Sequence, residues 1–410
     1  MTTFLTARYV LAHDGRRIVE LRDAVVVIEG DAIVAVEQGE DAEAMVAAAA
    51  DDSRAEIIDL GNSLLMPGLI DLDALTDIDH LNLDSWWHPE HDARLNWSSA
   101  YAAAGARDVL SEAERSTLRR YALVQLVLHG ITSAMPIATE VHSAWAETHD
   151  DLLDVARTAS ELGLRIFLGP SYRSAVHTTS AEGAPAMHWD EARGWAGFRD
   201  AVRFLDTADA LQDPLVTGIL APCRVETVAE DVLRATAEES ARRGTLVRAH
   251  ATQELSEREI IRERYDATPL EHLASVGLLN DRLILAHGVY LDVHPAVLGR
   301  DTGELSILAG AGVSIVHCPL TNARYAFLLE KLSQYLAQGV NIALGTDSFP
   351  PDLIRAIDTG VQTAKAQHGS LGSGLLAEYI EAATLGGARA LHRGDLGRIA
   401  EGSTADLVAF

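Results

Sequence analysis

Three residues that could bind a metal ion or carry a proton stand at the ends of short apolar runs: His250, His287 and Asp347. Each run has the length and composition of a buried strand. Imidazole nitrogens and a carboxylate oxygen are the ligands that a catalytic Zn²⁺ or Fe²⁺ accepts, with one coordination position left for water. A single histidine at a strand end more often belongs to the packing. Three such side chains favour one shared site, provided that the fold brings the strand ends together.

The strands that would position these residues belong to a repeating pattern that starts near residue 64. Apolar runs alternate with stretches of helical periodicity, such as residues 112–128 and 231–243, which is typical of repeated βα units. Eight such units close into a parallel (β/α)8 barrel, and the carboxyl ends of its strands meet on one face. The eight predicted strands are residues 64–75, 130–138, 164–172, 216–222, 245–251, 282–291, 313–319 and 340–346.

The two ends of the chain differ from this pattern. Residues 1–63 contain short strand-like runs separated by Gly and Asp turns, and residues 392–410 return to the same pattern. We therefore predict an α/β protein with a (β/α)8 barrel in residues 64–391. Residues 1–63 and 392–410 would form one split β-sandwich domain, and its C-terminal part would be short because the sequence stops within a strand-like run.

Composition limits the partners of the protein. The 410 residues carry a formal net charge of −27, which argues against binding to nucleic acid or to an anionic membrane surface. Two cysteines, Cys223 and Cys318, cannot build a disulfide framework or a thiolate zinc cluster. The first residues contain no apolar run long enough for a signal peptide. We expect a cytoplasmic protein that acts on a small molecule, with no nucleic-acid or membrane partner.

Several motifs, in this order along the chain, resemble the amidohydrolase superfamily. The most similar branch contains chlorohydrolases, aminohydrolases and cytosine- and adenosine-type deaminases. The resemblance spans nearly the whole chain and implies hydrolysis of a non-peptide C–N bond in a small heterocyclic substrate, by a homodimer. The motifs are residues 66–71, the strand that carries His250, residues 285–288, 317–322 and 345–347, and the ending 397–408.

The resemblance also implies roles for the residues at the strand ends. His250 and Asp347 would ligate a metal, and His287 would orient the attacking water. The family's first-strand His-x-His pair is replaced by Asp73 and Leu75, and leucine cannot ligate. We therefore expect an atypical site with at most one divalent ion, Zn or Fe, held by His250, Asp347 and Asp73, or no metal. Neither of the two lysines lies on a predicted barrel strand, which excludes a carbamylated-lysine two-metal site.

The proton shuttle of the family is also altered. Its glutamate, three residues after the strand-five histidine, corresponds to Gln253 here. Glutamine cannot exchange a proton at neutral pH. Glu254 is the candidate replacement, provided that its side chain turns inward.

Other side chains near the strand ends are candidates for contact with a substrate. Trp86 and Trp87 would form an apolar wall or lid over an organic ring. Tyr172 and Arg173 end the third strand, and His317 ends the seventh. On the fifth strand and directly after it, Arg248 and Gln253 are further candidates. Three loop histidines could replace the missing ligands by folding inward: His80, His88 and His91.

Arg248 introduces a permanent charge into the barrel. The two-residue period of a strand places it on the same side as His250. A buried guanidinium needs a partner, and Asp73 or Asp71 could supply it. Such a pair would fill part of the volume of a metal site; alternatively, Arg248 pairs lower in the barrel and leaves the metal unaffected.

Three functions stay open at this point. The first is a metal-assisted hydrolase. The second is a metal-independent hydrolase or lyase, in which His287 or His317 works with Asp347 as acid and base and Arg248 stabilises charge. The third is a pseudoenzyme that keeps the site only for binding, since fold does not determine function.

Overall fold

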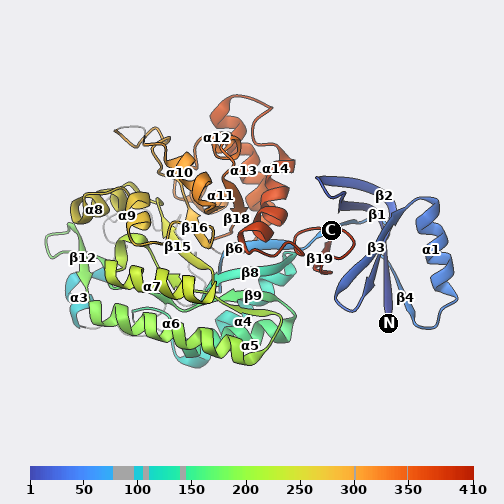
Figure 1. The fold of residues 1–410 in the computed structure, drawn as a ribbon, viewed down its shortest axis with the longest axis horizontal. Helices are drawn as coiled ribbons and strands as arrows, with labels where there is room; N and C mark the ends of the chain where they lie inside the picture. Colours follow the sequence, from blue (N-terminus) through green and yellow to red (C-terminus); the bar gives the residue numbers. More distant parts are fainter. Residues whose placement is uncertain (77–96, 105–109, 139–144, 300–301, 349) are drawn as a thin grey trace.

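A computed structural model describes residues 1–76, 97–104, 110–138, 145–299, 302–348 and 350–410. Figure 1 shows two parts, a strand-rich N-terminal part beside a larger body of strands surrounded by helices. Among the described residues, none of the helices combines the length and the apolar composition needed to cross a membrane.

A six-stranded sheet forms the first part, and both ends of the chain contribute to it. Its order is β19-β5-β1-β2-β3, and β4 pairs with β1. Helix α1 (Glu40–Ala50) packs on one face, where Ala42 is buried with Val25 and Val27. The strands are β1 (Thr2–His13), β2 (Ile18–Glu29), β3 (Ala32–Gln38), β4 (Ala55–Asp59), β5 (Leu64–Pro67) and β19 (Leu407–Ala409).

The sheet differs from the sequence-based boundaries at one strand. Residues 64–67 were predicted to begin the barrel, but β5 pairs with β1 and β19 in the N-terminal sheet. The chain enters the barrel only with β6 (Leu69–Leu75). The C-terminal tail is attached to the barrel by the buried Arg165, whose Nε lies 3.0 Å from Oδ2 of Asp406.

Two four-stranded parallel sheets form the barrel, one in the order β13-β9-β8-β6 and the other β15-β16-β17-β18. A parallel bridge between Leu220 and Val247 joins the sheets on one side, and contacts between β18 and β6 join them on the other. The (β/α)8 prediction is therefore confirmed. The strands are β6, β8 (Ile131–Ile137), β9 (Arg165–Leu168), β13 (Val216–Gly218), β15 (Val247–Ala251), β16 (Leu283–His287), β17 (Ser314–His317) and β18 (Asn341–Leu344).

Helices cover the outside of the barrel, as their apolar faces require. In α5, Leu152, Val155 and Ala159 are buried along one face, and a capping box of Thr148 and Asp151 begins the helix. The helices are α3 (Ser99–Ala104), α4 (Glu112–Leu128), α5 (His149–Leu162), α6 (Glu191–Leu211), α7 (Glu230–Arg243), α8 (Leu255–Tyr265), α9 (Pro269–Ser275), α10 (Glu304–Ala311), α11 (Pro319–Arg324), α12 (Leu332–Ala337), α13 (Leu353–His368), α14 (Leu376–Glu381) and α15 (Gly387–Ala390).

Short elements at the strand ends complete the fold. Strand β10 (Ser171–Tyr172) pairs with β14 (Ala221–Pro222), and a 3₁₀ turn, η2 (Val225–Thr227), follows β14. A small sheet, in the order β12-β11-β7, is formed by β7 (Trp97–Ser98), β11 (Ala175–Thr179) and β12 (Pro185–Trp189).

Candidate active site

The carboxyl ends of four barrel strands bring together Asp73, His250, His287 and Asp347. Asp73 lies at the centre of this group. Its Oδ1 is 3.7 Å from Nε2 of His250, and its Oδ2 is 3.9 Å from Nε2 of His287. Nε2 of His287 is also 3.8 Å from Oδ2 of Asp347. The barrel thus places in one cluster the four residues that the sequence selected from separate strands.

The backbone is unusual at three of these strand ends. Thr252, His287 and Asp347 have φ values of 55°, 75° and 55°. Residues other than glycine rarely adopt this left-handed region. Each such residue costs on the order of 1–3 kcal/mol, and such strain is concentrated at functional sites. A close approach stabilises the turn at Asp347: a Cβ on Gly345 would lie 2.6 Å from that of Asp73. This approach allows the Asp347 amide to donate to the Asp73 carbonyl at 2.6 Å.

Asp71 locks the first and eighth strands together below the site. Its carboxylate accepts hydrogen bonds from the Thr346 hydroxyl at 2.6 Å and from the Thr346 amide at 3.1 Å. Burial raises the pKa of Asp71 to about 7. Asp73 stands two residues after Asp71, and Asp347 directly follows Thr346. The contact between Asp71 and Thr346 therefore positions both Asp73 and Asp347.

His250 has a defined orientation. Its Nδ1 lies 2.8 Å from the Cys223 carbonyl, which can only accept, so Nδ1 carries the proton. Burial, followed by the charge of Arg224, lowers the pKa of His250 well below its usual value. The neutral ring therefore turns the lone pair of Nε2 toward Asp73. Two acceptors 3.7 Å apart repel each other unless a cation lies between them.

His287 is also neutral and completely buried. Burial is the main cause that lowers its pKa, and His250 is the second. Neither ring nitrogen has a hydrogen-bond partner of acceptable geometry among the described residues. Buried imidazoles without partners are costly unless they serve a ligand or a reaction.

The donors around Asp73 fit one divalent cation. Nitrogen and oxygen ligands about 2.1 Å from a tetrahedral ion lie about 3.4 Å apart. The separations of 3.7–3.9 Å between the histidine nitrogens and the carboxylate oxygens are close to this value. One donor atom each from Asp73, His287, Cys318 and Asp347 lies within 4.8 Å of all the others.

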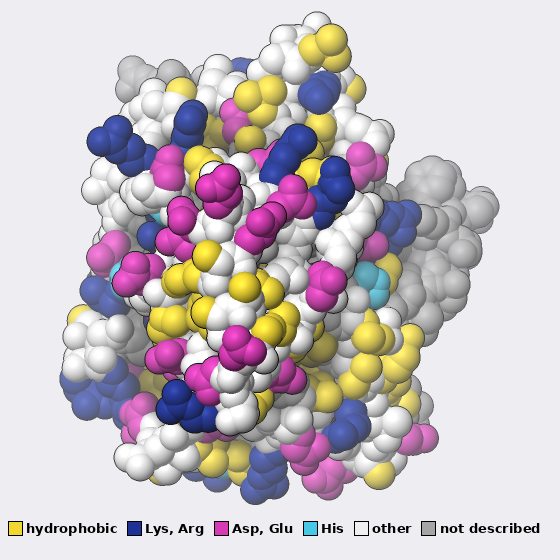
Figure 2. All heavy atoms as spheres, turned by 90° about the vertical axis from the view of Figure 1, so that its right-hand side faces the viewer, with side chains coloured by type: hydrophobic (Ala, Val, Ile, Leu, Met, Phe, Trp, Pro, Cys, Tyr) yellow, Lys and Arg dark blue, Asp and Glu magenta, His cyan; other side chains and the backbone are white. Residues whose placement is uncertain are grey.

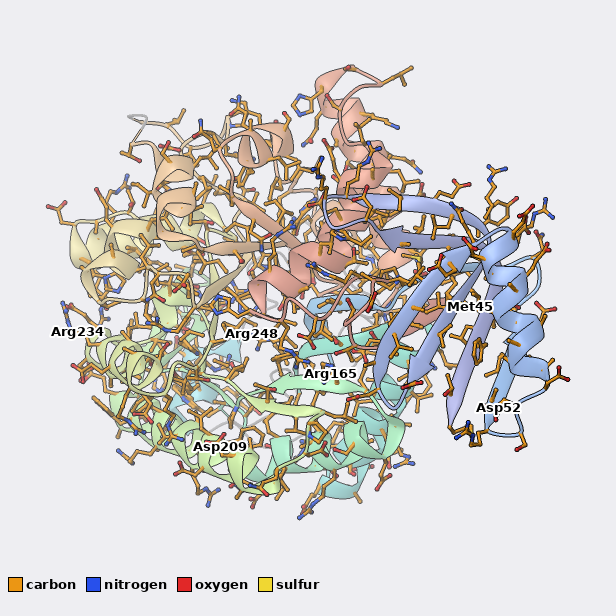
Figure 3. All side chains as sticks on the ribbon, turned by 45° about the vertical axis from the view of Figure 1, so that its right-hand side comes forward. Met45, Asp52, Arg165, Asp209, Arg234 and Arg248 are labelled. Atoms are coloured by element: carbon orange, nitrogen blue, oxygen red, sulfur yellow. The ribbon has the colours of Figure 1, made fainter. Side chains whose placement is uncertain are left out.

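Arg248 is a neighbour of this cluster, and Figure 3 shows it among the barrel strands. Its Nη1 lies 3.9 Å from Oδ1 of Asp73 and donates to the Met135 carbonyl at 3.1 Å. Asp73 is thus a charged neighbour of Arg248, but at 3.9 Å the two side chains are beyond hydrogen-bonding distance, so the hydrogen-bonded Arg248–carboxylate pair predicted from the sequence is not formed. The reason is that the carbonyl of Met135, on β8, accepts the hydrogen bond of this guanidinium nitrogen.

Two predicted site residues lie elsewhere. Tyr172, predicted to contact substrate, is fully buried, and its hydroxyl bonds to Thr236 of α7 at 2.7 Å. Its ring packs against Phe198 of α6, so it faces the outer helices. Glu254, the predicted shuttle, is exposed before α8 and accepts from the Ser256 hydroxyl at 3.0 Å. The chain direction at a strand end decides which side chain turns inward, and neither of these two side chains is among those that meet at Asp73; their predicted roles stay predictions.

Glu257 is a buried acid that the sequence analysis missed. Its carboxylate accepts from the backbone amides of Thr252 and Gln253, directly after β15. Burial, and next the charge of Glu226, raises its pKa well above the usual value. Glu226 is itself buried and lies 3.0 Å from Nε2 of His177. A glutamate in the first turn of a helix after a catalytic strand was the available signal.

The remaining substrate candidates keep their status as predictions. Gln253 is buried, and its Oε1 has no hydrogen-bond partner among the residues described. His317 is buried, and burial lowers its pKa to about 3. Arg173 donates through Nε to the Trp145 carbonyl. Five predicted residues lie outside the described part of the chain: Trp86, Trp87, His80, His88 and His91.

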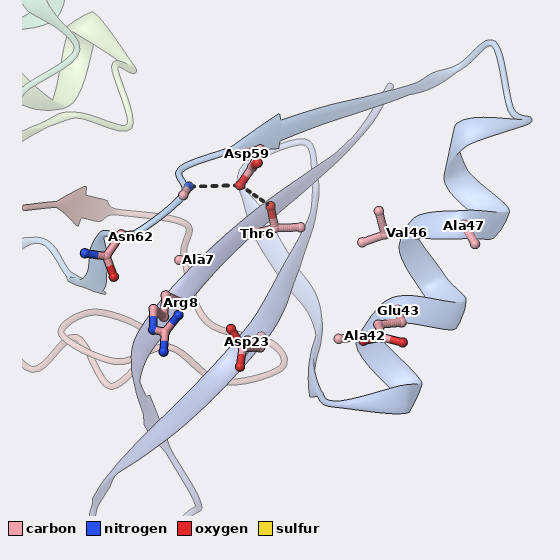
Figure 4. Close-up of a pocket in the computed structure, with 12 residues that line it drawn as sticks. Thr6, Ala7, Arg8, Asp23, Ala42, Glu43, Val46, Ala47, Asp59 and Asn62 are labelled. Carbon is pink, nitrogen blue, oxygen red and sulfur yellow. Dashed lines mark hydrogen bonds between the residues drawn. The ribbon is translucent and has the colours of Figure 1, made fainter.

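A separate cavity of about 570 Å³ lies between α1 and the N-terminal sheet (Figure 4). Its lining includes Arg8, Asp23 and Glu43, with no histidine or cysteine. The Asp59 carboxylate in this cavity accepts hydrogen bonds from the Thr6 hydroxyl at 3.1 Å and from the Gly61 amide at 2.9 Å. Figure 2 views this side of the molecule, where acidic side chains surround a group of apolar ones. The lining of this cavity therefore lacks the imidazole and thiol groups that the barrel site has.

The comparison with known proteins agrees with the barrel site. The model of the amidohydrolase family matches residues 64–410. The chain belongs to the amidohydrolase family. The resemblance predicted from the motifs is thereby confirmed.

Curated relatives of this amidohydrolase include deaminases. A 5-methylthioadenosine/S-adenosylhomocysteine deaminase 2 of Archaeoglobus fulgidus is 27% identical over 401 residues, which are 95% of this chain and 84% of the relative. An 8-oxoguanine deaminase of Pseudomonas aeruginosa is 27% identical over 358 residues, covering 86% of this chain and 75% of the relative.

Solved structures share the fold of this amidohydrolase. An adenosine deaminase from Xanthomonas campestris with bound zinc has a TM-score of 0.74 at 24% identity, covering 99% of this chain and 84% of the other. Atrazine chlorohydrolase from Arthrobacter aurescens, complexed with zinc, has a TM-score of 0.75 at 22% identity, covering 100% and 87%.

Proposed function

We propose that this amidohydrolase hydrolyses a non-peptide C–N bond of a small heterocyclic compound, as a deaminase does, with one divalent cation in its barrel. The observation that carries the proposal is the convergence of two neutral histidines and two aspartates on one point, with an acceptor of His250 facing an acceptor of Asp73 at 3.7 Å. The deaminase names of the curated relatives support the substrate class.

Each residue has a distinct task in this proposal. Asp73, His250 and Asp347 hold the cation, and the Cys223 carbonyl keeps His250 in the tautomer that can ligate. When bound, the cation supplies a water whose pKa is lowered toward about 7. Nε2 of His287 and Oδ2 of Asp347, 3.8 Å apart, are the two acceptors that would take up a proton at this site.

The proton must then reach the leaving nitrogen, because hydrolysis of a C–N bond places oxygen on carbon and hydrogen on nitrogen. Gln253 cannot carry it. His287 can, because a neutral imidazole accepts a proton at one step and returns it at the next. Gln253 has a different use: its buried Oε1 can accept a hydrogen bond from a ring N–H and orient the heterocycle.

The test is ammonia release from a panel of aminated heterocycles, including adenine nucleosides, 8-oxoguanine and aminotriazines, with zinc-loaded protein. His250→Ala, His287→Ala and Asp347→Ala should each abolish turnover. His368→Ala, on the exposed end of α13, is the matched control and should keep it. Unchanged kcat in all three site variants would contradict the assignment, and binding without turnover would indicate a pseudoenzyme.

One observation favours a second candidate, a metal-independent hydrolase or lyase. The Arg248 guanidinium lies 3.9 Å from Asp73, and its positive charge competes with a cation there. His287 or His317 with Asp347 would then act as acid and base, and Arg248 would stabilise negative charge in the transition state. Turnover that survives complete removal of metal by a chelator would select this candidate.

We also propose a cytoplasmic homodimer in which the two ends of the chain, with β5 as part of their sheet, form one domain beside the barrel that starts at β6. Cys223 and Cys318 are both buried and form no disulfide, which agrees with a reducing compartment. Sedimentation equilibrium of the purified chain tests the dimer, and localisation of a tagged chain tests the compartment.

A further inference from the structure

The first barrel strand provides too few ligands for the cation of the proposed function. Asp73 can bind it, but Leu75, two residues further and buried, has no donor atom. With His250 and Asp347 the site reaches the three protein ligands of a catalytic zinc. The His250 nitrogen, however, is not part of the group of four donors that lie within 4.8 Å of one another. A further donor is therefore sought among the other side chains that meet at Asp73.

Cys318 offers such a donor. It is completely buried, and its Sγ lies 3.5 Å from Oδ2 of Asp73. Cys318 directly follows β17 and stands two residues after Val316, so the side chains of Cys318 and Val316 point to the same side of the strand. Gly345 packs against this side, because a Cβ on Gly345 would lie 3.0 Å from the Val316 side chain. The same face of Gly345 contacts Asp73, so β17 delivers the sulfur to the carboxylate.

The geometry matches a shared ion. A sulfur ligand about 2.3 Å and an oxygen ligand about 2.1 Å from a tetrahedral zinc lie about 3.6 Å apart. The observed 3.5 Å between Cys318 and Asp73 agrees with this separation. A second observation is independent of the sulfur. His287 is completely buried and contributes one donor atom to the same 4.8 Å cluster, and neither of its ring nitrogens has a hydrogen-bond partner of acceptable geometry among the described residues.

We propose that the Cys318 sulfur is a ligand of the cation at this site, together with Asp73 and Asp347. The inference rests on the proposed function only in requiring a cation here. It has a consequence for metal choice, because a thiolate selects zinc, cobalt or iron over magnesium, calcium and manganese. The alternative is a cysteine that fills space and donates a weak hydrogen bond to Asp73.

The test is the absorption spectrum of the full chain loaded with Co²⁺. Sulfur coordination adds a thiolate-to-cobalt charge-transfer band in the near ultraviolet, apart from the visible bands of the ion. The chain offers a matched control, since Cys223 is the other cysteine and is also buried. We expect the band in the native protein and in Cys223→Ser, and its loss in Cys318→Ser with the visible bands retained.

A second measurement does not depend on how the variants fold. X-ray absorption of the native zinc-loaded chain should show one sulfur neighbour at about 2.3 Å. Cys318→Ser should lower zinc affinity by at least about 100-fold, because loss of partners outside the ligand shell already costs about 10–100-fold.

The outcomes separate this inference from the proposed function. Bound cobalt or zinc without a sulfur signal overturns the inference and leaves the function standing. A sulfur signal without hydrolysis of any heterocycle supports the inference and contradicts the function. A chain that takes up no cation overturns both the inference and the metal-assisted function.

Discussion

Replacement of Asp73 and Arg248 tests whether the two buried charges at the centre of the site stabilise each other. Their nearest atoms are 3.9 Å apart, and their side chains are 1% and 2% exposed. At an effective dielectric constant of about 20, unit charges at this distance attract by about 4 kcal/mol. Removal of one partner leaves the other buried without its counter-charge, which typically costs about 3–5 kcal/mol. We expect Asp73→Asn and Arg248→Met each to lower the free energy of unfolding of the metal-free protein by about 3 kcal/mol.

The assay is a double-mutant cycle, with urea unfolding followed by tryptophan fluorescence in the presence of a chelator. The double variant removes both charges, so it should cost no more than either single change, which gives a coupling energy of at least about 3 kcal/mol. The exposed pair of Arg22 and Glu20, 2.9 Å apart, is the control, and its cycle should give less than about 1 kcal/mol. Additive effects of the Asp73 and Arg248 changes, within about 0.5 kcal/mol, would refute the reasoning from distance and burial.

Three further predictions follow from the contacts. Glu257→Gln should lower kcat, because the Glu257 carboxylate holds the backbone amides of Thr252 and Gln253 after β15. Glu254→Gln should leave kcat unchanged, because Glu254 bonds only to the nearby Ser256 hydroxyl among the contacts described. Equal effects of the two changes would contradict the positions of the two acids. Tyr172→Phe should cost about 1 kcal/mol of stability through loss of its bond to Thr236, with kcat/KM unchanged in the same assay. His317, whose pKa is about 3 in the folded state, binds fewer protons there than when unfolded, so stability falls as pH drops from about 6.5 toward 3. His317→Asn should remove about 1.4 kcal/mol per pH unit from that slope in metal-free protein, and an unchanged slope would show that this histidine does not cause it.

Much of the fold could be predicted from the sequence because its signals are local. Each barrel strand is a short apolar run that ends before a helical stretch, and each predicted range contains a strand. The same signals place His250, His287 and Asp347 at strand ends, and a parallel barrel puts all strand ends on one face. The exception was residues 64–67: an apolar run predicts a strand but does not say which sheet it joins.

The directions of side chains beyond the strand ends could not be predicted in this way. After β15 the left-handed φ of Thr252 turns the chain, so Glu254 faces solvent and Glu257 returns into the interior. The distance between Cys318 and Asp73 likewise depends on how closely β17 and β6 approach across Gly345.

The sequence by itself determined that this chain forms a (β/α)8 barrel of the amidohydrolase family, with His250, His287 and Asp347 at the ends of its strands. Only the tertiary structure decided which acids and which sulfur reach Asp73. The physical reason is that a strand is specified by the alternation of neighbouring residues, whereas a contact of 3.5–3.9 Å depends on the packing of several strands and on single backbone angles where they end.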